Sequence, residues 1–92
     1  MEVKVLNERR NELSDGLSVW YEFEYMGNIG EYSVNEYKSE NNVVHCITLE
    51  DDLYVAWESN RDNNAVVYPE GFDEVAFREA FKECFDIDIP EA

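Results

Sequence analysis

The segment that most constrains the fold is residues 18–37, in which apolar and polar side chains alternate on both sides of a short loop. Successive side chains of a strand point to opposite faces, so this alternation predicts a β-hairpin with one buried and one solvated face. The core face of the first strand, residues 18–26, is expected to carry Val19, Tyr21, Phe23 and Tyr25. The outer face is expected to carry Ser18, Trp20, Glu22, Glu24 and Met26. The loop of residues 27–30 holds two glycines, which tolerate positive φ, and residues 31–37 resume the alternation as the second strand.

Four more strands and one helix are expected along the rest of the chain. The strands are residues 2–6, 43–49, 53–59 and 65–68, and the helix is residues 73–85 with Asp73 as its N-cap. The polar stretch of residues 7–16 ends in Ser-Asp-Gly and is interpreted as a loop, with a helical turn at residues 7–13 as the alternative. Residues 53–59 also fit a helical spacing with Thr48 as a possible N-cap, but a strand is favoured.

The helical spacing of residues 73–85 places five side chains on one face that is expected to cover the sheet: Phe77, Ala80, Phe81, Cys84 and Phe85. Beyond the helix, residues 86–89 alternate before Pro90 and either fray or add a short edge strand. The predicted fold is α+β: a single antiparallel β-sheet of about five to six strands in hairpin and meander order, with one C-terminal α-helix packed on one face.

Composition indicates a single domain over residues 1–92 with an aromatic-rich core, since 45% of the residues are apolar and 14% are aromatic. The formal net charge is −15, from 22 acidic and seven basic side chains. Nucleic acid and anionic membranes need Lys and Arg for binding, so both are excluded as direct partners. The partners that remain are a basic protein surface or a cation, and simple solubility is the other explanation of the charge. The first four residues lack the features of a signal peptide and no apolar run reaches about 20 residues, so a cytoplasmic location is expected.

The sequence offers little for catalysis, and no enzymatic activity is expected. His45, the single histidine, lies in an apolar strand beside Cys46, and neighbours on a strand point to opposite faces. A His–Cys nucleophile pair is therefore disfavoured, and Cys46 and Cys84 are expected to be free thiols. Clustered metal-binding cysteines, a calcium loop and nucleotide-binding glycine motifs are all lacking, so no cofactor and no metal is expected beyond weak surface binding of a cation.

The distribution of charge is more informative than any motif. Between Arg10 and Arg61 the chain has one basic residue, Lys38, against eleven acidic residues. Glu22 and Glu24 share a strand face about 6.8 Å apart, and the backbone of a nucleic acid carries one charge about every 3.4 Å of axis per strand. The predicted partner-binding residues combine these carboxylates with an aromatic anchor and the densest acidic cluster: Trp20, Glu22, Glu24, Glu31, Glu50, Asp51 and Asp52. Tyr21 or Tyr25 is considered as a further aromatic anchor, and Trp20 is either exposed or buried by a second layer.

In general character, as a small acidic α+β protein with few cysteines, the chain resembles the nucleic-acid-mimicking inhibitors that phages and mobile elements direct against restriction or CRISPR nucleases. It is also similar to small acidic immunity proteins that block bacterial toxins. The resemblance is one of composition over the whole chain. It implies a DNA mimic of the anti-restriction or anti-CRISPR type with a basic nucleic-acid-binding protein as partner. The alternative is a toxin-immunity protein or adaptor with one basic protein partner.

Overall fold

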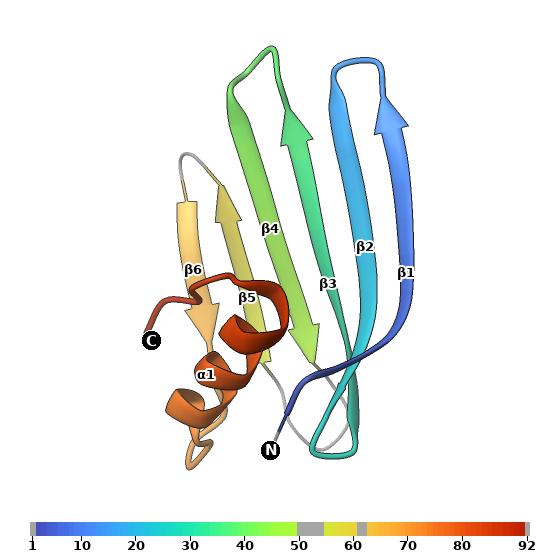
Figure 1. Ribbon diagram of the computed structural model, residues 1–92. Coiled ribbons are helices and arrows are strands. Elements are labelled where there is room, and N and C mark those ends of the chain that lie inside the picture. Colours follow the sequence, from blue (N-terminus) through green and yellow to red (C-terminus); the bar gives the residue numbers. More distant parts are fainter. Residues whose placement is uncertain (1, 50–54, 61–62, 92) are drawn as a thin grey trace.

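The computed structural model describes residues 2–49, 55–60 and 63–91, which form one six-stranded antiparallel sheet and one helix (Figure 1). The strands are β1 (Lys4–Leu13), β2 (Gly16–Tyr25), β3 (Asn28–Tyr37), β4 (Asn42–Leu49), β5 (Val55–Asn60) and β6 (Asn63–Val67), and the helix is α1 (Glu74–Phe85). Each strand pairs with its neighbour in sequence, in the order β1-β2-β3-β4-β5-β6. The predicted α+β meander is confirmed.

The β2–β3 hairpin forms where the alternation predicts it, but its loop is shorter than expected. The two strands are joined by Met26 and Gly27 alone, both with positive φ (52° and 78°). A two-residue loop of this kind matches the right-handed twist of the flanking strands. Asn28 and Gly30, expected in the loop, belong to β3, and the side-chain amide of Asn28 donates to the carbonyl oxygen of Met26 (3.2 Å).

β1 corrects the interpretation of residues 7–16 as a loop. The strand continues to Leu13 and pairs with β2 along its whole length, with one register shift between Val5 and Asn7. All ten side chains of β1 are exposed, because it is an edge strand with no layer on either face. An edge strand of this kind has no apolar face, so hydrophobic alternation cannot reveal it.

The second meander also follows the prediction. Residues 55–60 form a strand, as favoured over the helix, while residues 53 and 54 lie outside the described residues. β6 begins at Asn63, within the stretch expected to be a turn, and residues 61 and 62 of that turn are likewise outside the described part of the chain.

The core lies between one face of the sheet and α1. α1 contributes the buried side chains Phe77, Ala80 and Phe81, and the sheet contributes mainly aromatic and aliphatic residues: Phe23, Tyr25, Tyr32, Ile47, Leu49 and Trp57. The ring of Phe81 contacts Tyr32 edge-on, with centroids 5.0 Å apart, and lies 5.9 Å from Phe23. The expected aromatic-rich core is therefore present, but Cys84 is exposed and does not join the core face of α1.

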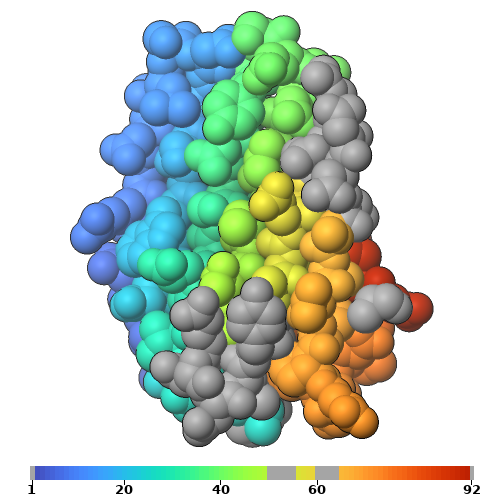
Figure 2. Space-filling view, turned by 180° about the vertical axis from the view of Figure 1, so that it is seen from behind, coloured from blue at the N-terminus to red at the C-terminus, as the bar shows by residue number. Residues whose placement is uncertain are grey.

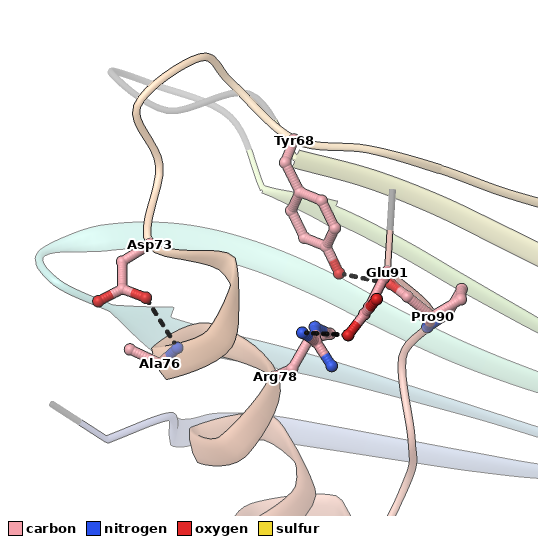
Figure 3. Close-up of polar contacts among 6 residues, drawn as sticks. All are labelled: Tyr68, Asp73, Ala76, Arg78, Pro90 and Glu91. Carbon is pink, nitrogen blue, oxygen red and sulfur yellow. Dashed lines mark hydrogen bonds and ion pairs between the residues drawn. The ribbon is translucent and has the colours of Figure 1, made fainter.

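Polar contacts hold the N-terminus of α1 and the tail that follows the helix (Figure 3). Asp73 is the N-cap as predicted, since its carboxylate accepts a hydrogen bond from the amide of Ala76 (3.1 Å). The tail after α1 neither frays nor forms a strand in the described residues. It packs back on the sheet with Ile89 buried, and the hydroxyl of Tyr68 donates to the carbonyl oxygen of Pro90 (3.1 Å). Arg78 also forms an ion pair with Glu91 (3.5 Å).

Candidate functional site: the open face of the sheet

The sheet face opposite α1 is the open face, and Figure 2 shows it from behind, with the strands running in order from blue to orange. α1 is the only helix in residues 2–49, 55–60 and 63–91, and it packs against the other face. The register defines two rows of open-face residues that cross all six strands. One row is Asn7, Glu22, Glu31, Thr48, Ala56 and Val67, and the next is Arg9, Trp20, Ser33, Cys46, Glu58 and Ala65.

The open face brings the predicted carboxylates of β2 and β3 together. Glu22 lies directly opposite Glu31, and Glu24 lies two residues along the strand from Glu22. Side chains directly opposite each other in an antiparallel pair have Cβ atoms about 4.5–5.5 Å apart, so Glu22 and Glu31 are closer than neighbours along one strand. Parity within one strand predicted that Glu22 and Glu24 share a face. Their proximity to Glu31 depends on the register of the hairpin.

The structure adds residues to this face that the sequence analysis did not select. Glu58 lies opposite Cys46 and is exposed, while Lys4 lies opposite Glu24 and Arg9 opposite Trp20. The sequence did contain a signal for Glu58, because it is an acidic residue at an outer position of the predicted strand of residues 53–59. Lys4 lies in the strand predicted for residues 2–6, and Arg9 lies in residues 7–16, which were expected to form a loop.

Trp20 is half-buried on the open face with no second layer of described residues above it. The guanidinium carbon of Arg9 lies 5.3 Å from the centroid of its ring, within the range of a cation–π interaction. Trp20 is therefore a partly accessible aromatic side chain with a cation beside it. Of the two further anchors considered, Tyr25 is buried beneath Phe77 of α1 and is not accessible, whereas Tyr21 is half-buried on the α1 face, packs on Phe85 and stays a prediction.

The second predicted cluster, Glu50, Asp51 and Asp52, lies outside the described residues. The three residues stay a prediction. In the part of the chain that the structure describes, no group of three His, Cys, Asp or Glu side chains is arranged to hold a metal ion.

His45 and Cys46 point to opposite faces, as expected. The ring of His45 stacks between Tyr32 and Trp57 on the α1 side, and its Nδ1 atom is 2.9 Å from the hydroxyl of Tyr32. Burial lowers the pKa of His45 and raises the pKa of the Cys46 thiol, with Glu58 adding to the shift of Cys46. The neutral imidazole and the protonated thiol are thus held apart by the sheet and do not form a nucleophile pair.

His45 also lines a shallow hollow of about 430 Å³ with Trp57, Ser59 and the tail after α1. Two carboxylates border this hollow, Asp86 and Asp88, and both form ion pairs with Lys82 (3.3 and 3.2 Å). Both carboxylates at this hollow are therefore engaged by Lys82 as contacts between α1 and the tail.

Among the described residues, no helix is long and apolar enough to cross a membrane. No protein-family model, no curated protein and no solved structure matches the chain.

Proposed function

We propose that the protein is a non-enzymatic inhibitor that presents the carboxylates of its open face to a basic, nucleic-acid-binding surface of a nuclease or defence complex. In this role it acts as an acidic nucleic-acid mimic of the anti-restriction or anti-CRISPR type and works by occupying the surface. The observation that carries the proposal is the pair Glu22 and Glu31, placed directly opposite each other on a face that α1 leaves open. Like charges in this arrangement destabilise a sheet, so they are better explained by binding than by folding.

The spacing of these groups supports mimicry. Positions two residues apart along a strand are spaced by about 6.8 Å, and neighbouring strands lie about 4.8 Å apart. The phosphates of one nucleic-acid strand follow each other at about 3.4 Å of axis, so carboxylates two residues apart on a strand match every second phosphate along the axis. The formal net charge of −15 would add long-range attraction and speed encounter with a basic partner.

Trp20 supplies the second element of the proposal. A half-buried tryptophan beside carboxylates has the features of an interface anchor, because aromatic side chains carry much of the affinity in protein interfaces. In the proposed complex, Trp20 anchors the protein at one place on the partner, and the carboxylates select a positively charged surface.

The mixed charge of the row through Trp20 favours the alternative, an immunity protein or adaptor with one basic protein partner. Arg9 lies over Trp20, and Glu58 is on the same row two strands beyond Ser33. A pure nucleic-acid mimic has no use for a cation next to its anchor. A surface that fits one protein partner can use both signs for specificity.

Competition separates the two functions. Host proteins would be captured on the immobilised protein at low salt and then eluted with excess duplex DNA or RNA. A partner of the mimic is expected to elute with nucleic acid and to bind less tightly as salt rises to physiological ionic strength. A partner that stays bound in excess nucleic acid would favour the adaptor, and binding that does not depend on salt would contradict electrostatic mimicry.

A charge-matched pair of variants tests the site. Glu22→Gln with Glu31→Gln should weaken binding to the captured partner, whereas Glu70→Gln with Glu79→Gln removes the same charge from exposed positions off the sheet and should leave binding nearly unchanged. If both double variants lose affinity equally, only net charge matters and the open face is not the site. If neither does, Glu50, Asp51 and Asp52 become the residues to test.

A further inference from the structure

The face of the sheet that carries α1 is only half covered by it. α1 has 12 residues and is about 18 Å long, whereas β2 and β3 have ten residues each and span about 34 Å. α1 starts near Tyr25, where Phe77 packs, and ends at Phe85, whose ring lies 4.9 Å from Tyr21. Figure 1 shows the upper halves of β1 to β4 with no helix in front of them.

The uncovered half carries a group of aliphatic side chains, which we call the aliphatic shelf: Leu17, Val19, Val34 and Val43. The register places Val19 opposite Val34, and Glu36 lies between Leu17 and Val43 in the next row. Val43 is 43% exposed, and Leu17 and Val34 are half-buried. Val19 is buried outside the core cluster beneath α1, whereas Val34 packs against that cluster, so the shelf extends the apolar core beyond the end of α1.

The strands that carry the shelf are tied to each other by hydrogen bonds. The tips of the two hairpins beyond it are joined, because Asp15 accepts hydrogen bonds from the amide and hydroxyl of Ser39, and its carbonyl oxygen accepts one from the amide of Lys38 (2.8 Å). β2 and β3 are also central strands, paired on both sides. An occupant of the shelf therefore finds no free main-chain groups on β2 or β3 and must satisfy its own backbone hydrogen bonds, as a helix does.

The charges around the shelf select the occupant. Glu12 and Glu36 lie in the same row as Leu17 and Val43, and Asp86, which pairs with Lys82, lies at the end of α1. The C-terminus of α1, which carries partial negative charge, ends one row from Val19. Arg10, opposite Val19, is the cation that the register places within this frame. With Glu12, Glu36 and Asp86 against Arg10 and Lys82, the rim is net acidic, so it complements Lys and Arg.

We propose that the aliphatic shelf binds an amphipathic helix of a partner protein, with an aliphatic face on Leu17, Val34 and Val43 and flanking Lys or Arg side chains on the acidic rim. The bound helix would continue the helical layer that α1 begins. This surface lies on the opposite side of the sheet from Glu22 and Glu31, so the inference stands independently of the proposed function.

The probe is a synthetic Leu–Lys peptide of about four helical turns, compared with a scrambled peptide of the same composition that has no apolar face. Methyl NMR locates the contact. The methyl signals of Val34 and Val43 are expected to shift with the amphipathic peptide, while those of Val44 and Val67 on the open face stay in place. Equal shifts on both faces, or equal binding of the scrambled peptide, would show attraction by net charge alone and overturn the proposal.

Val43→Glu provides the decisive variant, because it adds negative charge while removing an apolar contact. Attraction by charge alone predicts tighter binding of the Leu–Lys peptide. The shelf predicts a loss of about tenfold, from the lost burial of the valine. Val67→Glu, at a position that is 52% exposed on the open face, adds the same charge and should bind at least as tightly as the unmodified protein. Equal or tighter binding of Val43→Glu would refute the shelf as the seat of the helix.

Discussion

The two faces of β2 differ completely although their residues alternate one by one along the same strand. Phe23 has no exposed surface and lies under α1, whereas its neighbours Glu22 and Glu24 are on the open face. The α1 side gains free energy from aromatic burial, while the open side carries like charges that reduce stability. The residues under α1 therefore make the fold, whereas the residues of the open face are free to be used for binding.

The α1 side is a network of rings and not a set of separate contacts. Phe81 alone lies within 6 Å, centroid to centroid, of Phe23, Tyr32, Phe77 and Phe85. Aromatic pairs of this kind add to the free energy of area burial. A change at one ring should therefore be felt by several others, in contrast to changes on the open face.

The largest expected difference between the faces comes from truncating Phe81. Phe81→Ala should lower the free energy of unfolding by about 3–5 kcal/mol, because it removes a fully buried ring and leaves a cavity. Val67→Ala on the open face should cost less than about 0.5 kcal/mol. Urea unfolding of both variants measures this. A loss below 1 kcal/mol for Phe81→Ala would mean that α1 does not depend on this core.

Gly30 tests how closely the α1 face is packed. A Cβ atom at Gly30 would lie 2.6 Å from the ring of Phe23 and 2.8 Å from the carbonyl oxygen of Thr48. Gly30→Ala is therefore expected to cost about 1–3 kcal/mol through overpacking.

A double-mutant cycle with Phe23→Leu identifies the cause of that cost. If the ring of Phe23 is the main obstacle, the penalty for Gly30→Ala should be smaller in the Phe23→Leu background. An unchanged penalty would instead assign the strain to the main chain of β4.

The pH dependence of the free energy of unfolding compares the two faces at His45 and Cys46. Burial lowers the pKa of His45 below its ordinary value of 6.5, so the unfolded state binds the proton more readily. The stability contributed by neutral His45 is fully present above pH 6.5 and is lost as the pH falls through its pKa in the folded protein. Urea unfolding between pH 7.5 and 5.5 should show this loss for the unmodified protein but not for His45→Gln. Cys46→Ser should follow the unmodified protein, and parallel curves for all three would refute the assignment.

The smallest expected effect is on the open face. Glu22→Gln with Glu31→Gln should raise Tm by about 1–3 °C at low salt, since it removes a directly opposed pair of like charges. The gain should shrink in 1 M salt, where charges are screened. Glu70→Gln with Glu79→Gln should raise Tm less. A fall in Tm for the first double variant would show that Glu22 or Glu31 makes stabilising contacts, and the two faces would then be less distinct.

Several elements could be predicted because their pattern depends on residues close in sequence. Alternation in residues 18–26 assigned Phe23 and Glu22 to opposite faces, and the helical spacing of Phe77 and Phe81 identified α1 together with its cap at Asp73. β1 could not be found in this way, since both its faces are exposed and pairing with β2 alone makes it a strand. Gly30 was predicted to lie in the loop. A glycine is needed at this position because the ring of Phe23 on the neighbouring strand leaves no room for a side chain, and a contact between strands is not visible along the chain.

The candidate site shows the same division. Periodicity determined which residues of one strand share a face, because the side-chain directions of a strand follow from its backbone geometry. The pairing register of the strands decided that Glu22 lies opposite Glu31 and that Trp20 lies opposite Arg9. The position and length of α1 decided that one face is open and that half of the other is uncovered. These are contacts between different strands and between layers, and their free energy depends on how strands and layers pack and not on the local preference of any residue.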